Sequence, residues 1–176
     1  MPLLGAATVG AGMWSIAPRG ARATVTALEA PKSLALPPVA HRSARFVIRG
    51  DVDPALAREG GAWLEHVADV FDREARAMGF EPLSPRGPLT VIFLARRDDF
   101  VAFASRTDGV DASGMGGYYA PGSNHAVVYD DRSTESFATA LASADPHERG
   151  AAAHDAHRAT QRKLAHEAAH LLAFNT

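Results

Sequence analysis

Hydrophobic positions along the chain alternate between short β-branched runs and the three- and four-residue spacing of helices. Residues 89–94 (LTVIFL) are almost entirely apolar, which is typical of a strand buried on both faces. Residues 54–78 instead repeat apolar side chains every three or four positions, after an N-cap at Asp53 and before Gly79. This pattern predicts a long amphipathic helix, with Gly60-Gly61 as a weak point inside it.

The remaining patterns extend this order to strand, helix, strand, helix, hairpin and helix. The further elements are a strand at 45–49, a short helix at 96–106, and strands at 118–119 and 126–129 joined by a turn at 121–124. The last helix is strongly indicated over 161–174, and both a start at Asp145 and a start near Thr160 fit the sequence. We therefore expect an α+β fold, in which a small mixed sheet with a hairpin edge packs on helices.

The first part of the chain differs from the rest. Residues 2–17 are apolar and uncharged and precede the small-x-small sequence Ala21-Arg22-Ala23, which indicates a signal peptide over 1–23 and export to the periplasm, envelope or medium. No basic residue precedes the apolar run, so a mis-chosen start or an N-terminal tail of a cytoplasmic protein stays open. Residues 24–43 contain three prolines and predict a linker, with the domain at 44–176.

Composition narrows the function classes. A net charge of -2 gives no indication of nucleic acid or an anionic membrane surface as a partner, and no segment after the N-terminal run approaches transmembrane length. The absence of cysteine excludes disulfides and thiolate metal ligands. Histidine is the one skewed residue type, because five of the eight lie in the last thirty residues or so.

Two of these histidines form the sequence His166-Glu167-Ala168-Ala169-His170. Residues four apart lie on one face of a helix, so both imidazoles can bind one metal ion, and the H-E-x-x-H spacing indicates Zn²⁺. Glu167 lies about 100° around the helix, where its carboxylate can reach a water bound to that ion and take its proton.

The rest of the helix tests this interpretation. With His166 at 0°, Leu164, Ala168 and Leu171 fall near about 160°, 200° and 140°. The apolar stripe thus lies opposite the histidines, as it should if the helix is buried through its back and presents a metal site. The alternative is a solvated helix with two exposed histidines that match the motif by chance.

Other side chains support weaker hypotheses. Tyr118 and Tyr119 could line the edge of a substrate cleft, although aromatic residues of a hairpin usually pack. His154 and His157 are three apart, but we expect them to be surface residues of the helix. We expect His125, near the hairpin turn, to be exposed.

Taken together, the chain from about residue 45 onward resembles peptidase-MA-like gluzincin domains, and in particular an uncharacterised, often exported bacterial family. The resemblance is carried by the H-E-x-x-H motif and by the segments 46–50 (FVIRG), 89–94, 117–121 (GYYAP) and 171–176 (LLAFNT). It implies a zincin-like fold, zinc ligands His166 and His170, and Glu167 as general base. It also implies a hairpin, 117–129, that aligns an extended peptide, and a third ligand in a later W-x-x-E-G segment.

No such segment follows His170 in this sequence. We therefore expect residues 44–176 to be the N-terminal part of a zinc-dependent metallopeptidase that is truncated after the motif helix and inactive as given. It would act on a peptide or protein substrate. One alternative is a non-catalytic zincin scaffold that serves as a binding or envelope-associated module; another is a complete small α+β protein with a coincidental motif.

Overall fold

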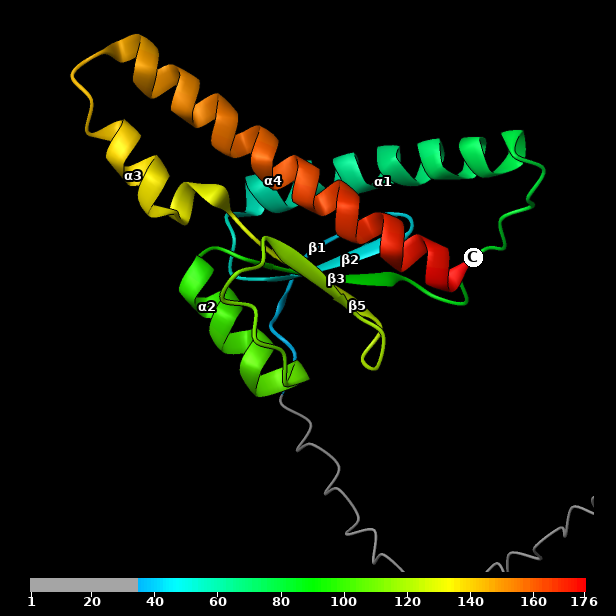
Figure 1. The fold of residues 1–176 in the computed structure, drawn as a ribbon. Helices are drawn as coiled ribbons and strands as arrows, with labels where there is room; N and C mark the ends of the chain where they lie inside the picture. Colours follow the sequence, from blue (N-terminus) through cyan, green and yellow to red (C-terminus); the bar gives the residue numbers. More distant parts are fainter. Residues whose placement is uncertain (1–34) are drawn as a thin grey trace, which may run out of the picture. The chain divides into compact units, whose positions relative to one another are not determined.

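A five-stranded mixed sheet forms the centre of the computed structural model, which describes residues 35–176 (Figure 1). The signal peptide expected at 1–23 lies outside the described residues. The strand order is β1-β2-β3-β5-β4, in which β2, β3 and β5 are parallel and the two edge strands are antiparallel to their neighbours. The strands are β1 (Val39–Arg42), β2 (Phe46–Gly50), β3 (Leu89–Leu94), β4 (Gly117–Ala120) and β5 (His125–Tyr129).

Helices cover both faces of this sheet. The two long helices, α1 (Pro54–Ala77) and α4 (Pro146–Asn175), pack on one face, and α2 (Arg97–Phe103) with the π-helical turn η1 (Ala104–Asp108) packs on the other (Figure 1). A 3-10 turn, η2 (Asp131–Ser133), and a short helix, α3 (Glu135–Leu141), connect β5 to α4. The predicted α+β class and the β4–β5 hairpin at a sheet edge are confirmed. None of the described helices combines the length and apolar character needed to cross a membrane.

The central strand β3 explains how the sheet builds two cores. Val91 and Phe93 face the α1–α4 side, whereas Ile92 and Leu94 face α2, because successive side chains of a strand point to opposite faces. All four are at most 6% exposed. The continuous apolar run at 89–94 is therefore the consequence of burial on both faces, as the sequence predicts.

Helix α1 is continuous through its two central glycines. A Cβ added at Gly61 would lie 2.6 Å from Cδ2 of His41 in β1, so a side chain at this position would have to displace the His41 ring. The sequence indicates the two glycines as a weak point of the helix. In the structure the helix runs through both, and Gly61 leaves room for the His41 ring.

The first strand corrects the expected domain boundary. Val39–Arg42 forms β1 and pairs antiparallel with β2, so the domain begins before Ala44 and the linker assignment was wrong for this part of 24–43. Four mixed residues after two prolines have no apolar periodicity, because an edge strand buries little of its surface. The short helix α3 was not expected either.

Of the two starts that the sequence allows for the last helix, the structure has the earlier one. The side chain of Asp145 accepts a hydrogen bond from the backbone N–H of His147 at 2.8 Å and caps α4.

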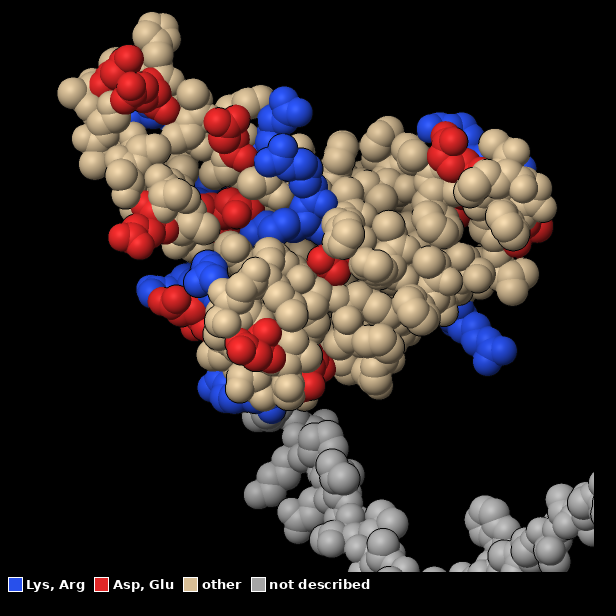
Figure 2. Space-filling view, viewed as in Figure 1, with Lys and Arg blue, Asp and Glu red and all other residues tan. Residues whose placement is uncertain are grey.

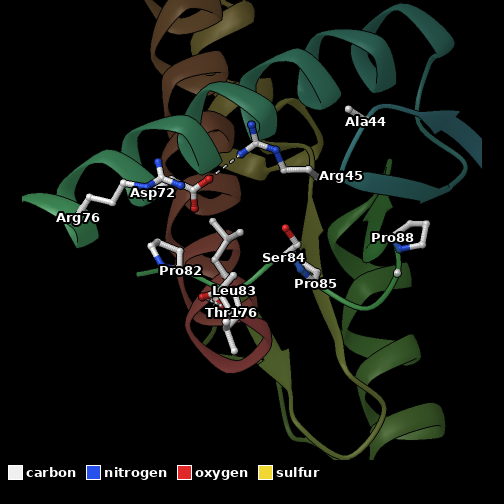
Figure 3. A pocket seen from close by; sticks show the side chains of 12 residues that line it. Ala44, Arg45, Asp72, Arg76, Pro82, Leu83, Ser84, Pro85, Pro88 and Thr176 are labelled. Carbon is white, nitrogen blue, oxygen red and sulfur yellow. Dashed lines mark hydrogen bonds and ion pairs between the residues drawn. The ribbon is translucent and has the colours of Figure 1, made fainter. Parts of the chain in front are cut away.

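An ion-pair network lines one side of a pocket beside the start of β2 (Figure 3). Arg45 forms ion pairs with Glu65 at 3.2 Å and Asp72 at 3.6 Å, and also with Asp69, all from α1. The α1–β3 connection, including Pro82 and Leu83, forms other parts of the lining. Because three carboxylates hold Arg45, this cluster joins β2 to α1 and leaves its charge compensated.

A second polar cluster joins η1 to the hairpin. His125 is 1% exposed, so the prediction that it is exposed was wrong. Its Nε2 lies 2.9 Å from Oδ2 of Asp108, which also accepts from the Tyr118 hydroxyl at 2.7 Å, while Ser123 donates to Oδ1 at 2.8 Å. Burial would raise the pKa of Asp108, but the hydrogen bonds from His125, Tyr118 and Ser123 outweigh it and lower that pKa from its ordinary 3.8.

Replacing Asp108 with Ala should lower the free energy of unfolding by about 2–4 kcal/mol, because two buried donors lose their acceptor. Urea denaturation at neutral pH measures this loss. A carboxyl whose folded pKa lies below its unfolded value stabilises the fold above the unfolded pKa. The contribution of Asp108 should therefore be retained above about pH 4 and lost as the pH falls through the lower folded pKa.

The exposed Asp155, in α4, is a matched control for this measurement. Asp155→Ala should leave the urea midpoint nearly unchanged. Equal midpoints for the Asp108 variant and the wild type would show that the cluster does not stabilise the fold.

Candidate metal centre

Helix α4 lies across the sheet with one apolar stripe facing inward. Leu164, Ala168, Leu171 and Leu172 are at most 2% exposed and belong to the core beneath α1 and α4. His166 and His170 of the opposite face are exposed. The prediction that the apolar stripe lies behind the two histidines is confirmed.

The two imidazoles are already arranged for a shared ligand. Their Nε2 atoms lie 3.3 Å apart, and the rings are nearly perpendicular, at 84°. Two nitrogen ligands at 2.0–2.1 Å from one tetrahedral zinc ion are separated by about 3.3 Å. One ligand atom from each of His166, Glu167 and His170 lies within 4.8 Å of the others. The separation of the two nitrogens thus matches that of two ligands of one Zn²⁺ ion.

Glu167 is placed differently from the histidines. It is 6% exposed and lies against the first residue of β4, where a Cβ added at Gly117 would be 3.0 Å from its Cγ. No hydrogen bond links its carboxylate to any of the groups described. Burial raises the pKa of Glu167, and the charges of His166 and His170 act in the opposite direction. A carboxylate beside the two imidazoles has the chemistry of a proton acceptor.

A cationic side chain fixes α4 one turn before Glu167. Nζ of Lys163 donates to the carbonyl of Tyr129 at 2.9 Å, pairs with Oδ2 of Asp131 at 2.8 Å and lies 3.3 Å from the centre of the Tyr129 ring. Thr160 donates to the same Asp131 oxygen at 3.0 Å. Burial lowers the pKa of Lys163, and the contacts with Asp131 oppose this shift. These contacts attach α4 to the end of β5.

An amide pair fixes the other end of the helix. Asn124, in the hairpin turn, and Asn175 exchange two side-chain hydrogen bonds of 2.9 Å. The Tyr119 hydroxyl donates to Asn124 at 2.8 Å, and its ring lies 5.1 Å from that of Phe174. The hairpin that carries β4 is thereby tied to α4 beyond the histidines.

The structure separates the two tyrosines that the sequence suggests for a cleft edge. Tyr119 packs on the α4 side of the sheet, the side of Glu167. Tyr118 belongs to the core beneath α2, with its hydroxyl on Asp108, and so faces the opposite side. Only Tyr119 is in a position to border the metal centre.

The other histidines of α4 do not join this group. His154 is exposed, and His157 lies 3.2 Å from Glu59 of α1, as expected for surface residues. Within 35–176, the three motif residues are the only cluster of three or more side chains that could hold a metal ion.

Sequence reasoning did not identify Lys163, Gly117 or the Asn124–Asn175 pair. The Gly116-Gly117 sequence at the start of β4 was the one available signal of a close approach to another element.

Surface charge also distinguishes two parts of α4. Figure 2 shows basic side chains grouped over the middle of the helix and a largely uncharged surface over its C-terminal half, which carries the motif. Arg158 and Arg162 are the exposed basic residues of this middle section. On the face shown, the C-terminal half of α4, to which the motif belongs, therefore carries less charge than the middle of the helix.

Comparison with protein-family models, curated proteins and solved structures gives no match to this chain. The zincin-like assignment therefore depends on the residues of the motif helix and on their geometry.

Zinc binding tests the two ligands directly. His166→Ala and His170→Ala should each raise the Zn²⁺ dissociation constant by more than about tenfold, because each removes one of two protein ligands. Isothermal titration with Zn²⁺ measures the change. His154→Ala removes an exposed histidine from the same helix and should bind zinc as the wild type does. Unchanged affinity in both motif variants would refute the ligand assignment.

Proposed function

We propose that this chain belongs to a zinc-dependent hydrolase of peptide bonds, in which His166 and His170 hold the metal and Glu167 is the general base. The observation that carries the proposal is the combination of two Nε2 atoms 3.3 Å apart with a buried carboxylate from the same helix turn. A pair of exposed histidines alone would indicate only metal binding. The buried Glu167 adds a proton acceptor beside it.

The chemistry divides between metal and protein. Bound zinc would supply Lewis acidity and lower the pKa of a coordinated water. The carboxylate of Glu167 takes a proton from the attacking water and returns it to the nitrogen of the leaving amine.

The centre as described has two histidine ligands, whereas catalytic zinc sites in proteins use three protein ligands. We propose that the third ligand comes from outside the described residues. Glu167 itself is a poor substitute, because a carboxylate that coordinates the metal is no longer free to accept the proton.

The neighbouring sheet edge supports a peptide as the substrate. β4 ends the sheet and pairs only with β5 among the described strands, so its other edge has no strand partner there. An extended peptide can add to such an edge as a further strand, which places its backbone beside Gly117 and Glu167. A peptide or protein therefore fits this centre better than a small molecule does.

The second function that we retain is a non-catalytic zinc-binding module on the same scaffold. It is supported by the presence of only two histidine ligands among the described residues. Both functions predict zinc binding, but only the hydrolase predicts turnover of a peptide substrate. Export stays a prediction for either.

Glu167→Gln separates these functions. In the full-length protein, this change should keep zinc affinity within about twofold and lower peptide hydrolysis by at least about a hundredfold, because the amide cannot accept a proton. A casein-derived fluorogenic peptide mixture and a zinc titration provide the two measurements.

Glu148→Gln, in the first turn of α4, is the control and should change neither property. Retained hydrolysis in Glu167→Gln would remove Glu167 from the role of base. A wild-type protein that binds zinc and hydrolyses nothing would favour the binding module.

A further inference from the structure

We propose that Gly117 is a positioning residue for Glu167: because position 117 lacks a side chain, the Glu167 carboxylate can occupy its place between α4 and β4. The structural part of this inference concerns a contact within the chain. Its catalytic part rests on the proposed function.

The contact is close on several sides. A Cβ at Gly117 would lie 3.0 Å from Cγ and 3.1 Å from Oε1 of Glu167, and 3.1 Å from the carbonyl oxygen of Val127. Distances of this size are shorter than ordinary van der Waals contact, so one of the neighbours would have to move.

The backbone on either side has little freedom to do so. β4 pairs with β5 through Gly117 and Val128, and α4 is held by Lys163 before Glu167 and by Asn175 after it. Ala168, directly after Glu167, is fully buried in the core. The Glu167 side chain, with its rotatable bonds, is therefore the group that would give way, and its carboxylate would change position.

The adjacent glycine provides a contrast. A Cβ at Gly116 would lie 3.0 Å from Cδ and 3.5 Å from Cγ of Lys163, the residue one helical turn before Glu167. Each of the two glycines thus meets a different side chain on the same face of α4. Gly116→Ala would disturb the stem of Lys163 and leave the Glu167 contact unchanged.

A stability cycle tests the contact independently of any activity. Gly117→Ala should lower the thermal midpoint by roughly 2–4 °C in the wild-type background, as expected for overpacking. In a Glu167→Ala background, most of this loss should disappear, and the contact with Val127 would account for the remainder.

Equal losses in the two backgrounds would overturn the inference. If Gly117→Ala does not fold, the double variant decides: a folded Gly117→Ala/Glu167→Ala protein supports the contact, and an unfolded one refutes it.

An activity cycle in the full-length protein tests the consequence for catalysis. Gly117→Ala should lower hydrolysis of the peptide mixture by at least about tenfold, since small displacements of a catalytic group cost this much or more. Zinc affinity should stay within about twofold, because neither histidine lies among the three atoms nearest to the added Cβ. Gly116→Ala should keep turnover within about twofold of the wild type.

A background with a shorter carboxylate shows whether Gly117 acts through Glu167. In Glu167→Asp, whose own turnover is the reference, adding Gly117→Ala should cause little further loss. The same tenfold loss in both backgrounds would place the effect on β4 itself and refute the positioning role. If the wild type has no hydrolytic activity, the proposed function fails, while the stability cycle still decides on the contact.

Discussion

The docking of α4 on the sheet is the constraint on which the rest of the site depends. Three leucines and Ala168 are at most 2% exposed on this helix, and full burial of each leucine contributes about 1.5–3 kcal/mol. Most other residues of its 30 are polar or alanine, so this stripe determines which side faces inward. Once it is buried, the helical pitch directs His166 and His170 outward and Glu167 toward β4.

Burial of Glu167 is unfavourable for folding in isolation. Removal of a carboxylate from water destabilises its charged form, and the raised pKa of Glu167 expresses this cost. Contacts on both sides of Glu167 hold α4 in place despite this cost. Lys163 bonds to Tyr129 and Asp131 before it, and Asn175 pairs with Asn124 after it. Groups kept in such unfavourable positions are concentrated at functional sites.

The sequence predicts those elements that depend on neighbouring residues of the chain, and misses those that depend on contacts between distant residues. The strand at 89–94 follows from its continuous apolar run, and the buried face of α4 follows from a spacing of 3.6 residues; both are confirmed. The burial of His125 depends instead on Asp108, seventeen positions earlier, and β1 depends on a partner strand rather than on its own four residues. The contact between Gly117 and Glu167 likewise joins residues fifty positions apart, and no spacing rule encodes it.

The position of β4 beside the His166–His170 pair is the feature that suggests a peptide substrate. Exposed sheet edges invite pairing with other chains, and proteins usually protect them with charge, proline or a covering element. Here β4 begins with Gly117, and the buried Glu167 side chain lies against this residue. Two histidines on a helix bind metal in many contexts, and a free edge binds extended chains in many others. In the function that we propose, their meeting at Glu167 would bring a peptide backbone, a metal ion and a proton acceptor to one place, as hydrolysis of a peptide bond requires.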